Sequence, residues 1–397
     1  MLSNWLSQIW LISAMNLRNI PQRWGSASVA IFGVACVVGV FVAVLSMASG
    51  FSRTMANAGS PNTVILMRAG STSEMSSGLS YEQAQTLATL NGITREGDKI
   101  LSSPELFVVV DIPKLATQSS ANVSLRGVEP TAFLVRDTIE LVEGRQFERG
   151  KNELIVGRSA QKQFANLAVG SEVKFGQTIW TVVGAFTANG GLAESELWCD
   201  AKILQAAYRR GNSYQTIRAK ISSPSALQDL KDAMAAEPSL NLDAQLETDY
   251  LAEQAGPMNK FIKGIGYPLA ILMALGAVFG AINTMYTSVA SRSREIATLR
   301  AIGFGAFPVA CSTLVESLAL AVIGGSLGAG VVYGIFNGYT VSTLNFASFS
   351  QVVFDFAVTP ALMQQGIVMA VVIGFIGGVF PAVRAARLPV AEALREV

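Results

Sequence analysis

Histidine is absent from this chain of 397 residues, and only 14% of the residues are charged. Soluble globular proteins contain roughly 25% charged residues, so charge is strongly depleted here. Without histidine, a Ser-His-Asp triad, a His-ligated zinc site and a histidine pH switch are excluded. The formal net charge of +1 would not attract a nucleic-acid backbone. What remains is a membrane protein with a sizeable soluble part.

Motifs for cofactors and catalysis are also scarce. No G-x-x-x-x-G-K-[ST] motif occurs, so the chain cannot bind ATP through a P-loop of its own. Cys199 is the only cysteine in the charged segment at residues 51–260, so this segment has no internal disulfide. The neighbouring acids Glu140, Glu143 and Glu148 are typical of a solvated surface. We expect no catalytic residue, no cofactor and no metal on this chain.

Long uncharged stretches dominate the rest of the sequence. A transmembrane helix needs about 20 apolar residues to cross a hydrocarbon core of ~30 Å. Four segments meet this requirement, at residues 24–50, 264–290, 307–336 and 361–383. A charged segment at 51–260 follows the first span, and a polar, turn-like loop at 337–358 precedes the last. The first span exceeds the core of about 7–15 residues in a signal peptide, so we expect it to remain as an anchor.

Lysine and arginine in short loops mark the cytoplasmic side of a membrane protein. Three short segments are basic, and they contain Arg18 and Arg23, then Arg292, Arg294 and Arg300, and finally Arg384, Arg387 and Arg395. The loop at 337–358 contains no basic residue. We therefore expect both termini in the cytoplasm, including the tail at 384–397, and the segment 51–260 outside.

The N-terminal segment, residues 1–22, has the pattern of an amphipathic helix. Apolar residues recur at helical spacing, as Leu2, Trp5, Leu6, Ile9 and Ile12. Pro21 would break this helix just before the first span begins. The pattern predicts a helix that lies on the inner leaflet in contact with membrane lipid.

The outer segment contains two strand–helix–strand units. The first is expected at residues 62–67, 81–90 and 105–112, and the second at 214–221, 224–236 and 240–246. Two such units suggest a split α+β sandwich of the ferredoxin-like type. Between them, residues 126–210 are predicted to form an inserted, β-rich subdomain. The predicted fold class is a membrane protein with four transmembrane helices and a large α+β extracytoplasmic domain.

Glycines recur four residues apart in three of the spans. The pairs are Gly276/Gly280, Gly324/Gly328, Gly330/Gly334 and Gly374/Gly378. This spacing lets helix backbones approach closely, so it predicts a tightly packed bundle or a dimer. Glu316, at the head of the third span, is a candidate for a proton relay. No histidine and no second buried acid would continue such a relay, so a structural role is favoured.

The segment 291–305, between the second and third spans, is predicted as a short amphipathic helix. Its apolar face contains Ile296, Leu299 and Ile302, and its polar positions are Arg292, Glu295 and Arg300. Gly303 would stop the helix. On this pattern alone, the helix could lie on lipid or dock into a partner protein.

Several longer runs of sequence are distinctive. They are AMNLRNIPQRW before the first span, SREIATLRAIGF with LVESLALAVIGGSLGAGVVYG, and the tail FPAVRAARLPVAEALR. These runs resemble the permease domain of MacB/FtsX-type ABC transporters. The outer segment resembles the periplasmic core of that family in EGRQF, ELIVGRSAQKQFANLAVGSEVKFG, TVVGAF and SELWCDAKIL. MacB carries an ATPase on the same polypeptide, whereas this chain is similar to the permease part alone.

The resemblance implies a way of working in the bacterial inner membrane, with the outer domain in the periplasm. Two protomers, identical or different, would pair, and each would dock a cytoplasmic ABC ATPase that carries ATP and Mg. The segment 1–22 would be the elbow helix and 291–305 the coupling helix. The implied coupling residues are Arg292, Arg294, Glu295, Ile296, Leu299, Arg300 and Gly303. ATP-driven closure of the spans would then move the outer domains by mechanotransmission.

For function, the resemblance implies a non-catalytic permease subunit that drives efflux together with a periplasmic membrane-fusion adaptor. One alternative is a lipoprotein-releasing permease, which a hook-like loop would favour, although no such loop is recognisable. A second alternative is an FtsX-like regulator of a periplasmic cell-wall hydrolase, whose relatives usually have a smaller outer domain. An enzyme is the least favoured class.

Overall fold

The computed structural model describes residues 2–393, and the chain divides into two compact units. The helical unit takes the residues up to 49, 261–339 and those from 357 onward. The α/β unit takes residues 50–260 and 340–356. Two long helices, α2 (Trp24–Ala58) and α8 (Glu247–Ser291), contribute residues to both units.

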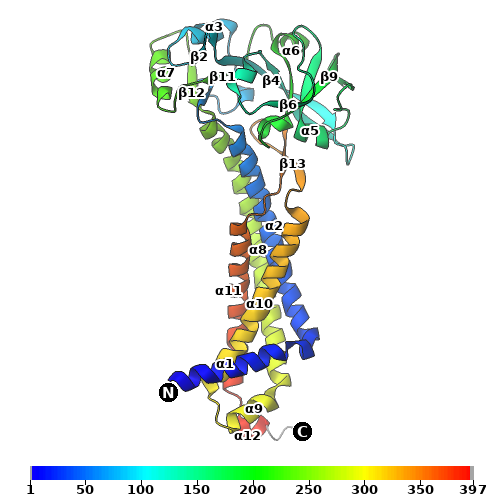
Figure 1. Ribbon diagram of the computed structural model, residues 1–397, viewed down its shortest axis with the longest axis vertical. Helices are drawn as coiled ribbons and strands as arrows, with labels where there is room; N and C mark the ends of the chain where they lie inside the picture. The colour runs from blue at the N-terminus through cyan, green and yellow to red at the C-terminus, as the bar shows by residue number, and fades with distance from the viewer. Residues whose placement is uncertain (1, 394–397) are drawn as a thin grey trace. The chain divides into compact units, whose positions relative to one another are not determined.

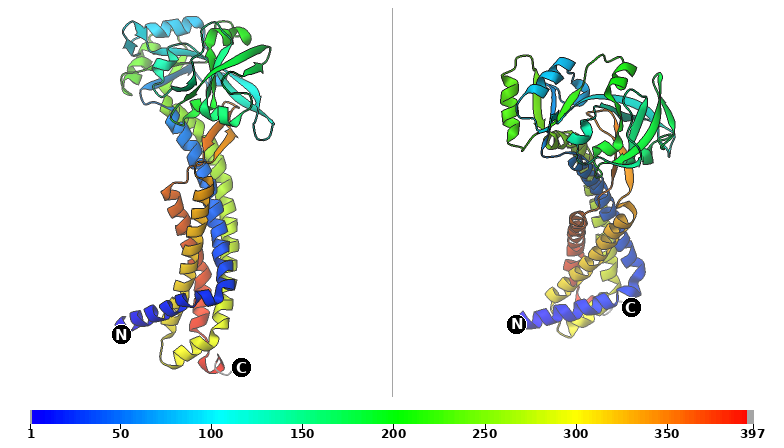
Figure 2. Two further views of the ribbon diagram at one scale, coloured as in Figure 1. Left: turned by 45° about the vertical axis from the view of Figure 1, so that its right-hand side comes forward. Right: turned by 45° about the horizontal axis from the view of Figure 1, so that its top comes forward.

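The helical unit combines long apolar helices with short ones (Figures 1 and 2). Besides α2 and α8 it contains α1 (Leu2–Arg18), η1 (Ile20–Arg23), α9 (Ser293–Ala301), α10 (Ala306–Phe336), α11 (Pro360–Ala386) and α12 (Val390–Ala393). Among the described residues, the helices long and apolar enough to cross a membrane are α2, α8, α10 and α11. Helix α8 begins well before the predicted span, because Glu247 and Asp249 in its first turn favour a helix start there.

Local sequence signals account for several helix ends. Pro21 lies in the first turn of η1, which separates α1 from α2. Gly303 has a φ of +109° just after α9, a conformation that residues with a Cβ rarely adopt. Thr359 caps α11 by accepting a hydrogen bond from the backbone N–H of Leu362, and Pro360 occupies the first helical position.

Two of the predicted glycine pairs hold helices of this unit together. A Cβ added at Gly324 or Gly328 would lie 2.6 or 2.3 Å from a backbone oxygen of α2. One added at Gly374 or Gly378 would lie 2.5 or 2.7 Å from a side chain of α10. These four positions require glycine because α10 approaches α2 and α11 so closely.

The other two pairs have no packing role within one chain. For Gly276, Gly280, Gly330 and Gly334, an added Cβ would meet no described atom within 4 Å. All four glycines lie on exposed faces of α8 and α10. Their part in a dimer therefore stays a prediction.

The first half of the α/β unit is a four-stranded antiparallel sheet in the order β12-β1-β11-β4. Its elements are β1 (Thr63–Arg68), α3 (Tyr81–Thr89), β4 (Ser102–Pro113), β11 (Thr216–Lys220), α7 (Ala226–Ala235) and β12 (Leu242–Leu246). Short elements connect them, namely η2 (Glu74–Ser76), β2 (Arg95–Glu96) and β3 (Lys99–Ile100). This order of two strand–helix–strand units confirms the predicted ferredoxin-like half.

The inserted half continues the same sheet from β4 through β5, β10, β7, β9 and β6, with β8 paired to β9. Its strands are β5 (Ser120–Val128), β6 (Glu140–Gly144), β7 (Glu153–Gly157), β8 (Glu172–Phe175), β9 (Thr178–Thr187) and β10 (Leu197–Asp200). Its helices are α4 (Ala132–Val135), α5 (Arg158–Gln163), η3 (Leu192–Ser195) and α6 (Ala201–Ala207). Trp180 and Trp198 are fully buried in its cores. The predicted β-rich insertion is confirmed.

The segment predicted as a turn-like loop at 337–358 contains a β-hairpin instead. Its strands are β13 (Thr340–Leu344) and β14 (Gln351–Asp355). The hairpin belongs to the α/β unit, where Val353 joins the core and Ser195 Oγ donates to the Val353 carbonyl at 3.2 Å. The polar residues of this segment obscured its β-branched strands, which pack against a core formed by distant residues.

Candidate functional site

Helix α9 packs its apolar face against other helices of the same unit. Ile296 is only 6% exposed and belongs to a small core that also contains Ile12 of α1, Val289 of α8, Val309 of α10 and Ala385 of α11. Leu299 lies partly buried against this core. Helices of this chain already cover the Ile296 side chain, so it is not exposed for contact with a partner, and its place among the implied coupling residues stays a prediction.

Arg292, directly before α9, is fixed by a buried ion pair. Its Nη1 lies 2.6 Å from Oε2 of Glu316 on α10, and both side chains are at most 7% exposed. Arg292 also donates a hydrogen bond to the side-chain oxygen of Asn16 on α1. Arg23 lies 3.7 Å from the other oxygen of Glu316. Glu316 is thus a structural partner of arginines, which agrees with the structural role favoured from the sequence.

Arg300, in the last turn of α9, binds the C-terminal end of α11. Its Nη1 donates to the carbonyl oxygens of Ala386 and Leu388, both at 2.9 Å. These carbonyls lie at a helix end, where no intrahelical N–H is available to them. Together with Arg292 and Ile296, this contact fastens α9 to α1, α8, α10 and α11.

The outward face of α9 consists of other residues. Arg294, Glu295, Thr298 and Ile302 are exposed, and we call them the outer α9 face. Ile302 is 72% exposed, which makes it the most accessible apolar residue of this segment. It was assigned to the apolar face from its spacing but was not included among the expected coupling residues. Of those residues, Arg294 and Glu295 point outward, and Gly303 follows them in an exposed turn.

The α/β unit contains a network of buried charges at its centre. We call it the charge network, and it consists of Arg126, Arg136, Arg218, Glu74, Glu105, Glu196 and Glu247. Arg126 of β5 forms ion pairs with Glu74 at 2.5 Å and Glu196 at 2.7 Å. Arg136 pairs with Glu105 of β4 at 2.6 Å. These residues cannot be recognised as a group in the sequence, because their contacts join segments far apart in the chain.

Arg218 of β11 connects the charge network to α8. It lies 2.6 Å from Glu105, 2.8 Å from Glu74 and 2.8 Å from Glu247, the first residue of α8. One turn along, the Tyr250 hydroxyl accepts a hydrogen bond from the backbone N–H of Glu74 at 3.3 Å. The start of α8 is thereby fixed to the ferredoxin-like half.

Electrostatics keep the acids of the charge network ionised. Burial alone would raise the pKa of Glu74, but the adjacent Arg126 and Arg218 lower it to about 2. Burial likewise opposes ionisation of Glu105, and Arg136, Arg218 and Arg126 nevertheless hold its pKa below the ordinary value. These carboxylates are paired with arginines, so they are not available as general acids or bases.

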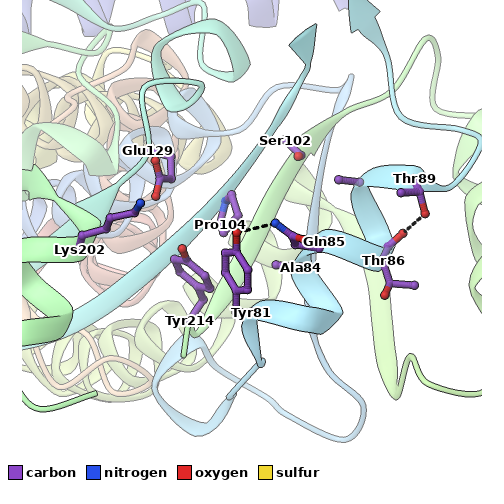
Figure 3. Close-up of a pocket in the computed structure, with 11 residues that line it drawn as sticks. Tyr81, Ala84, Gln85, Thr86, Thr89, Ser102, Pro104, Glu129, Lys202 and Tyr214 are labelled. Atoms are coloured by element: carbon purple, nitrogen blue, oxygen red, sulfur yellow. Dashed lines mark hydrogen bonds between the residues drawn. The ribbon is translucent and has the colours of Figure 1, made fainter. Parts of the chain in front are cut away.

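A cleft of about 680 Å³ lies between α3, β4 and α6 of the α/β unit. Figure 3 shows Tyr81, Gln85, Glu129, Lys202 and Tyr214 among its lining residues. Gln85 donates to the Tyr81 hydroxyl at 2.5 Å. The lining includes neither histidine nor cysteine. Among the residues whose side chains the structure describes, no cluster of three or more acids or cysteines could hold a metal ion.

Two family models match this chain. The MacB-like periplasmic core domain matches residues 27–237, and the FtsX-like permease C-terminal domain matches residues 268–390. The first match contains α2 and most of the α/β unit, and the second contains α9, α10 and α11.

Curated relatives show the same pattern. The ABC transporter permease YknZ of Bacillus subtilis is 22% identical over 96% of this chain and 98% of its own length. The macrolide export ATP-binding/permease protein MacB of Escherichia coli is 27% identical over 78% of this chain and 49% of its own length. MacB 1/2 of Paracoccus denitrificans is 24% identical over 92% of this chain and 55% of its own length. The chain thus spans about half the length of these MacB relatives.

Solved structures of similar domains have also been found. The periplasmic region of MacB from Actinobacillus actinomycetemcomitans gives a TM-score of 0.37 at 18% identity and covers 49% of this chain and 92% of that one. The extracellular domain of YknZ gives a TM-score of 0.34 at 16% identity, and the match covers 47% of this chain and 99% of that one. Since the core-domain match alone spans more than half of the chain and the permease match follows it, this protein belongs to the MacB/FtsX family of ABC transporter permeases.

Proposed function

We propose that this chain is the membrane subunit of an exporter, in which a separate ATPase hydrolyses ATP and α9 receives the resulting force. One observation carries the proposal, namely that α9 is fastened to four helices of its own unit. Arg292 binds Glu316 of α10 and Asn16 of α1, and Arg300 binds the end of α11. Ile296 fills the core between these helices and α8. A displacement of α9 would therefore move the helices together.

The outer α9 face is the surface we assign to the ATPase. A docking helix needs an exposed apolar contact and charges that fix its register. Ile302 supplies the exposed apolar contact, and Arg294 and Glu295 supply the charges. This assignment replaces Ile296 and Leu299 as the apolar contact. ATP and Mg would be bound by the ATPase chain, and this chain would carry no catalytic residue.

Helix α8 provides a direct route for the motion. It runs without interruption from Glu247, in the charge network, to Ser291, directly before Arg292. In the proposed topology, α9 and both termini are in the cytoplasm, and the α/β unit is in the periplasm of a bacterial inner membrane. The basic residues of the short loops support this orientation.

Export with a periplasmic adaptor is the activity we propose, because several relatives are named as macrolide exporters that contain both permease and ATPase. This chain spans only about half of the length of those relatives. A second permease protomer, identical or different, would pair with this one. The exposed faces with Gly276/Gly280 and Gly330/Gly334 are the surfaces on which helices could approach most closely.

The test is an Ile302→Asp variant of the full chain, produced together with its ATPase. A carboxylate at this position would be placed unpaired in the docking groove of the ATPase, so binding should weaken at least tenfold. Permease-stimulated ATP hydrolysis should fall with it. Gln22→Asp is the matched control, because Gln22 is an exposed residue of η1 that receives the same charge outside the outer α9 face. Unchanged ATPase binding and stimulation by Ile302→Asp would refute the assignment of this face.

A further inference from the structure

A groove of about 610 Å³ opens in the helical unit between α8 and the C-terminal end of α11. Tyr286 of α8 forms one side, and Phe380, Val383, Arg384 and Arg387 form much of the other. The groove has an apolar part and a cationic part. Neither the sequence patterns nor the proposed function assigns a role to it.

The groove begins where two tightly packed helices separate. At Gly377 of α11, an added Cβ would lie 2.7 Å from the Cβ of Ala281 on α8, so the helices are in close contact there. Seven residues further along α11, at Arg384, the space between the helices is open and Tyr286 borders it. The guanidinium carbon of Arg384 lies 5.3 Å from the centre of the Tyr286 ring, which holds this cation at the groove.

Two arginines of the groove have no acidic partner in the described part of the chain. Among the side chains that the structure describes, none forms an ion pair with Arg384 or Arg387, and the residues lining the groove include no Asp or Glu. Near α9, by contrast, Arg292 pairs with Glu316, and Arg300 donates hydrogen bonds to two backbone carbonyls. The lining of the groove therefore offers an anion two guanidinium groups that no lining acid neutralises.

The other wall suits an acyl chain. Phe380 is 58% exposed and Val383 is 44% exposed, and both lie within the span candidate Pro360–Ala386. Because they precede the arginines by about one turn of helix, the apolar wall continues toward the middle of the span. A phospholipid has the same order of groups, with an anionic headgroup at the membrane surface and apolar chains below it.

We infer that this groove is a binding site for an anionic phospholipid, with the headgroup phosphate on Arg384 and Arg387 and an acyl chain along Phe380 and Val383. An acidic protein surface is a weaker match, because Phe380 and Val383 belong to a membrane-spanning helix. The inference rests on the helical unit alone. It holds whether or not the outer α9 face binds an ATPase, and in either leaflet.

The experiment uses the full chain purified in detergent, with phosphatidylglycerol and phosphatidylcholine as probes. Lipid retention is measured by native mass spectrometry, and affinity by lipid titration. In the double variant Arg384→Gln/Arg387→Gln, affinity for phosphatidylglycerol should fall about tenfold or more, since each basic residue near an anionic headgroup contributes about 1 kcal/mol. Arg384→Lys/Arg387→Lys should retain most of the binding, because it keeps both charges. Arg18→Gln is the control for loss of an exposed cation at the end of another helix.

Several outcomes would overturn the inference. Equal affinity of the double glutamine variant and the unaltered chain would remove the groove as the site. Equal binding of phosphatidylcholine would show that the charges do not select an anionic lipid, and displacement of the lipid by millimolar inorganic phosphate would identify a site for a free anion. If the double variant lost ATPase binding but kept its lipids, the groove would belong to a protein interface. That last result is distinct from failure of the outer α9 face, which Ile302→Asp tests separately.

Discussion

In the α/β unit three buried arginines lie at the centre of the fold, whereas the helical unit has its buried arginine at the end of the bundle, next to α9. Arg126, Arg136 and Arg218 share four glutamates that join both halves of the sheet. Arg292 pairs with one buried acid, Glu316, and lies 3.6 Å from the exposed carboxylate of Glu295. The middle of the bundle is instead packed through glycines that touch backbone or small side chains.

The difference follows from the surroundings in which each unit folds. In water, burial of large apolar side chains such as Trp180 and Trp198 drives folding and can offset the cost of burying charges. Between helices in a bilayer this driving force is absent, because lipid tails are as apolar as leucine. Close van der Waals contact between helices remains as a source of stability, and glycine allows the helices to approach closely enough for it. Substitutions should therefore destabilise the α/β unit most where they break a charge pair, and the helical unit most where they add a side chain between packed helices.

The largest effect is expected for Arg218→Met, which removes the arginine that contacts three acids of the charge network. Breaking a buried ion pair from one side costs about 3–5 kcal/mol, because an uncompensated charge stays behind. Denaturant unfolding followed by the fluorescence of buried Trp180 and Trp198 would measure this cost. Lys220→Met is the control, since Lys220 lies two residues along the same strand and its Asp137 partner is 65% exposed. The control should lose less than about 1 kcal/mol.

If both substitutions cost the same, the charge network would contribute no more than a surface pair. The comparison between the two units would then lose its basis, because packing alone would stabilise the α/β unit as it does the helical one.

Much of the fold follows from the sequence, because its signals are local. Uncharged runs mark the spans, and periodic apolar residues mark the strand–helix–strand units. The hairpin Thr340–Asp355 was missed because its strands are short and its stability comes from contact with a core built by residues far away in the chain. Local propensity does not contain that information.

The candidate site was only partly predictable for a similar reason. The spacing of Ile296, Leu299 and Ile302 shows that α9 is amphipathic, but amphipathicity does not reveal what covers the apolar face. The structure shows that Ile296 is covered by this chain and that Ile302 is not. The four glycine pairs are identical as sequence patterns, yet Gly328 packs against α2, whereas Gly330 packs against no described helix. Which side of a helix meets a neighbour is decided by the tertiary arrangement.

A somewhat smaller effect is expected from acid on the charge network. The pKa of Glu74 is lowered from 4.5 to about 2 in the folded chain, so its pairing stabilises the fold fully above pH 4.5. As the pH falls from 4.5 to 2, this contribution of about 3 kcal/mol should be lost, and Glu105 should add to the loss. Unfolding measured at a series of pH values tests this slope. Glu74→Gln should flatten it, and an equally steep slope in that variant would show that other groups are responsible.

The smallest of the three effects is expected for shape in the helical unit. Gly328→Leu would place a Cβ 2.3 Å from the carbonyl oxygen of Ala35, so α10 and α2 must separate. Overpacking of this kind typically costs about 1–3 kcal/mol. Thermal unfolding of the full chain in detergent measures it, and Gly330→Leu is the matched control on the same helix, where an added Cβ meets nothing within 4 Å. The control should change stability by less than about 0.5 kcal/mol.

A stable Gly328→Leu protein would show that the bundle tolerates wider spacing and is not held by shape. If Gly330→Leu left the stability of the chain intact but abolished its self-association, the exposed glycine face would be the contact between protomers.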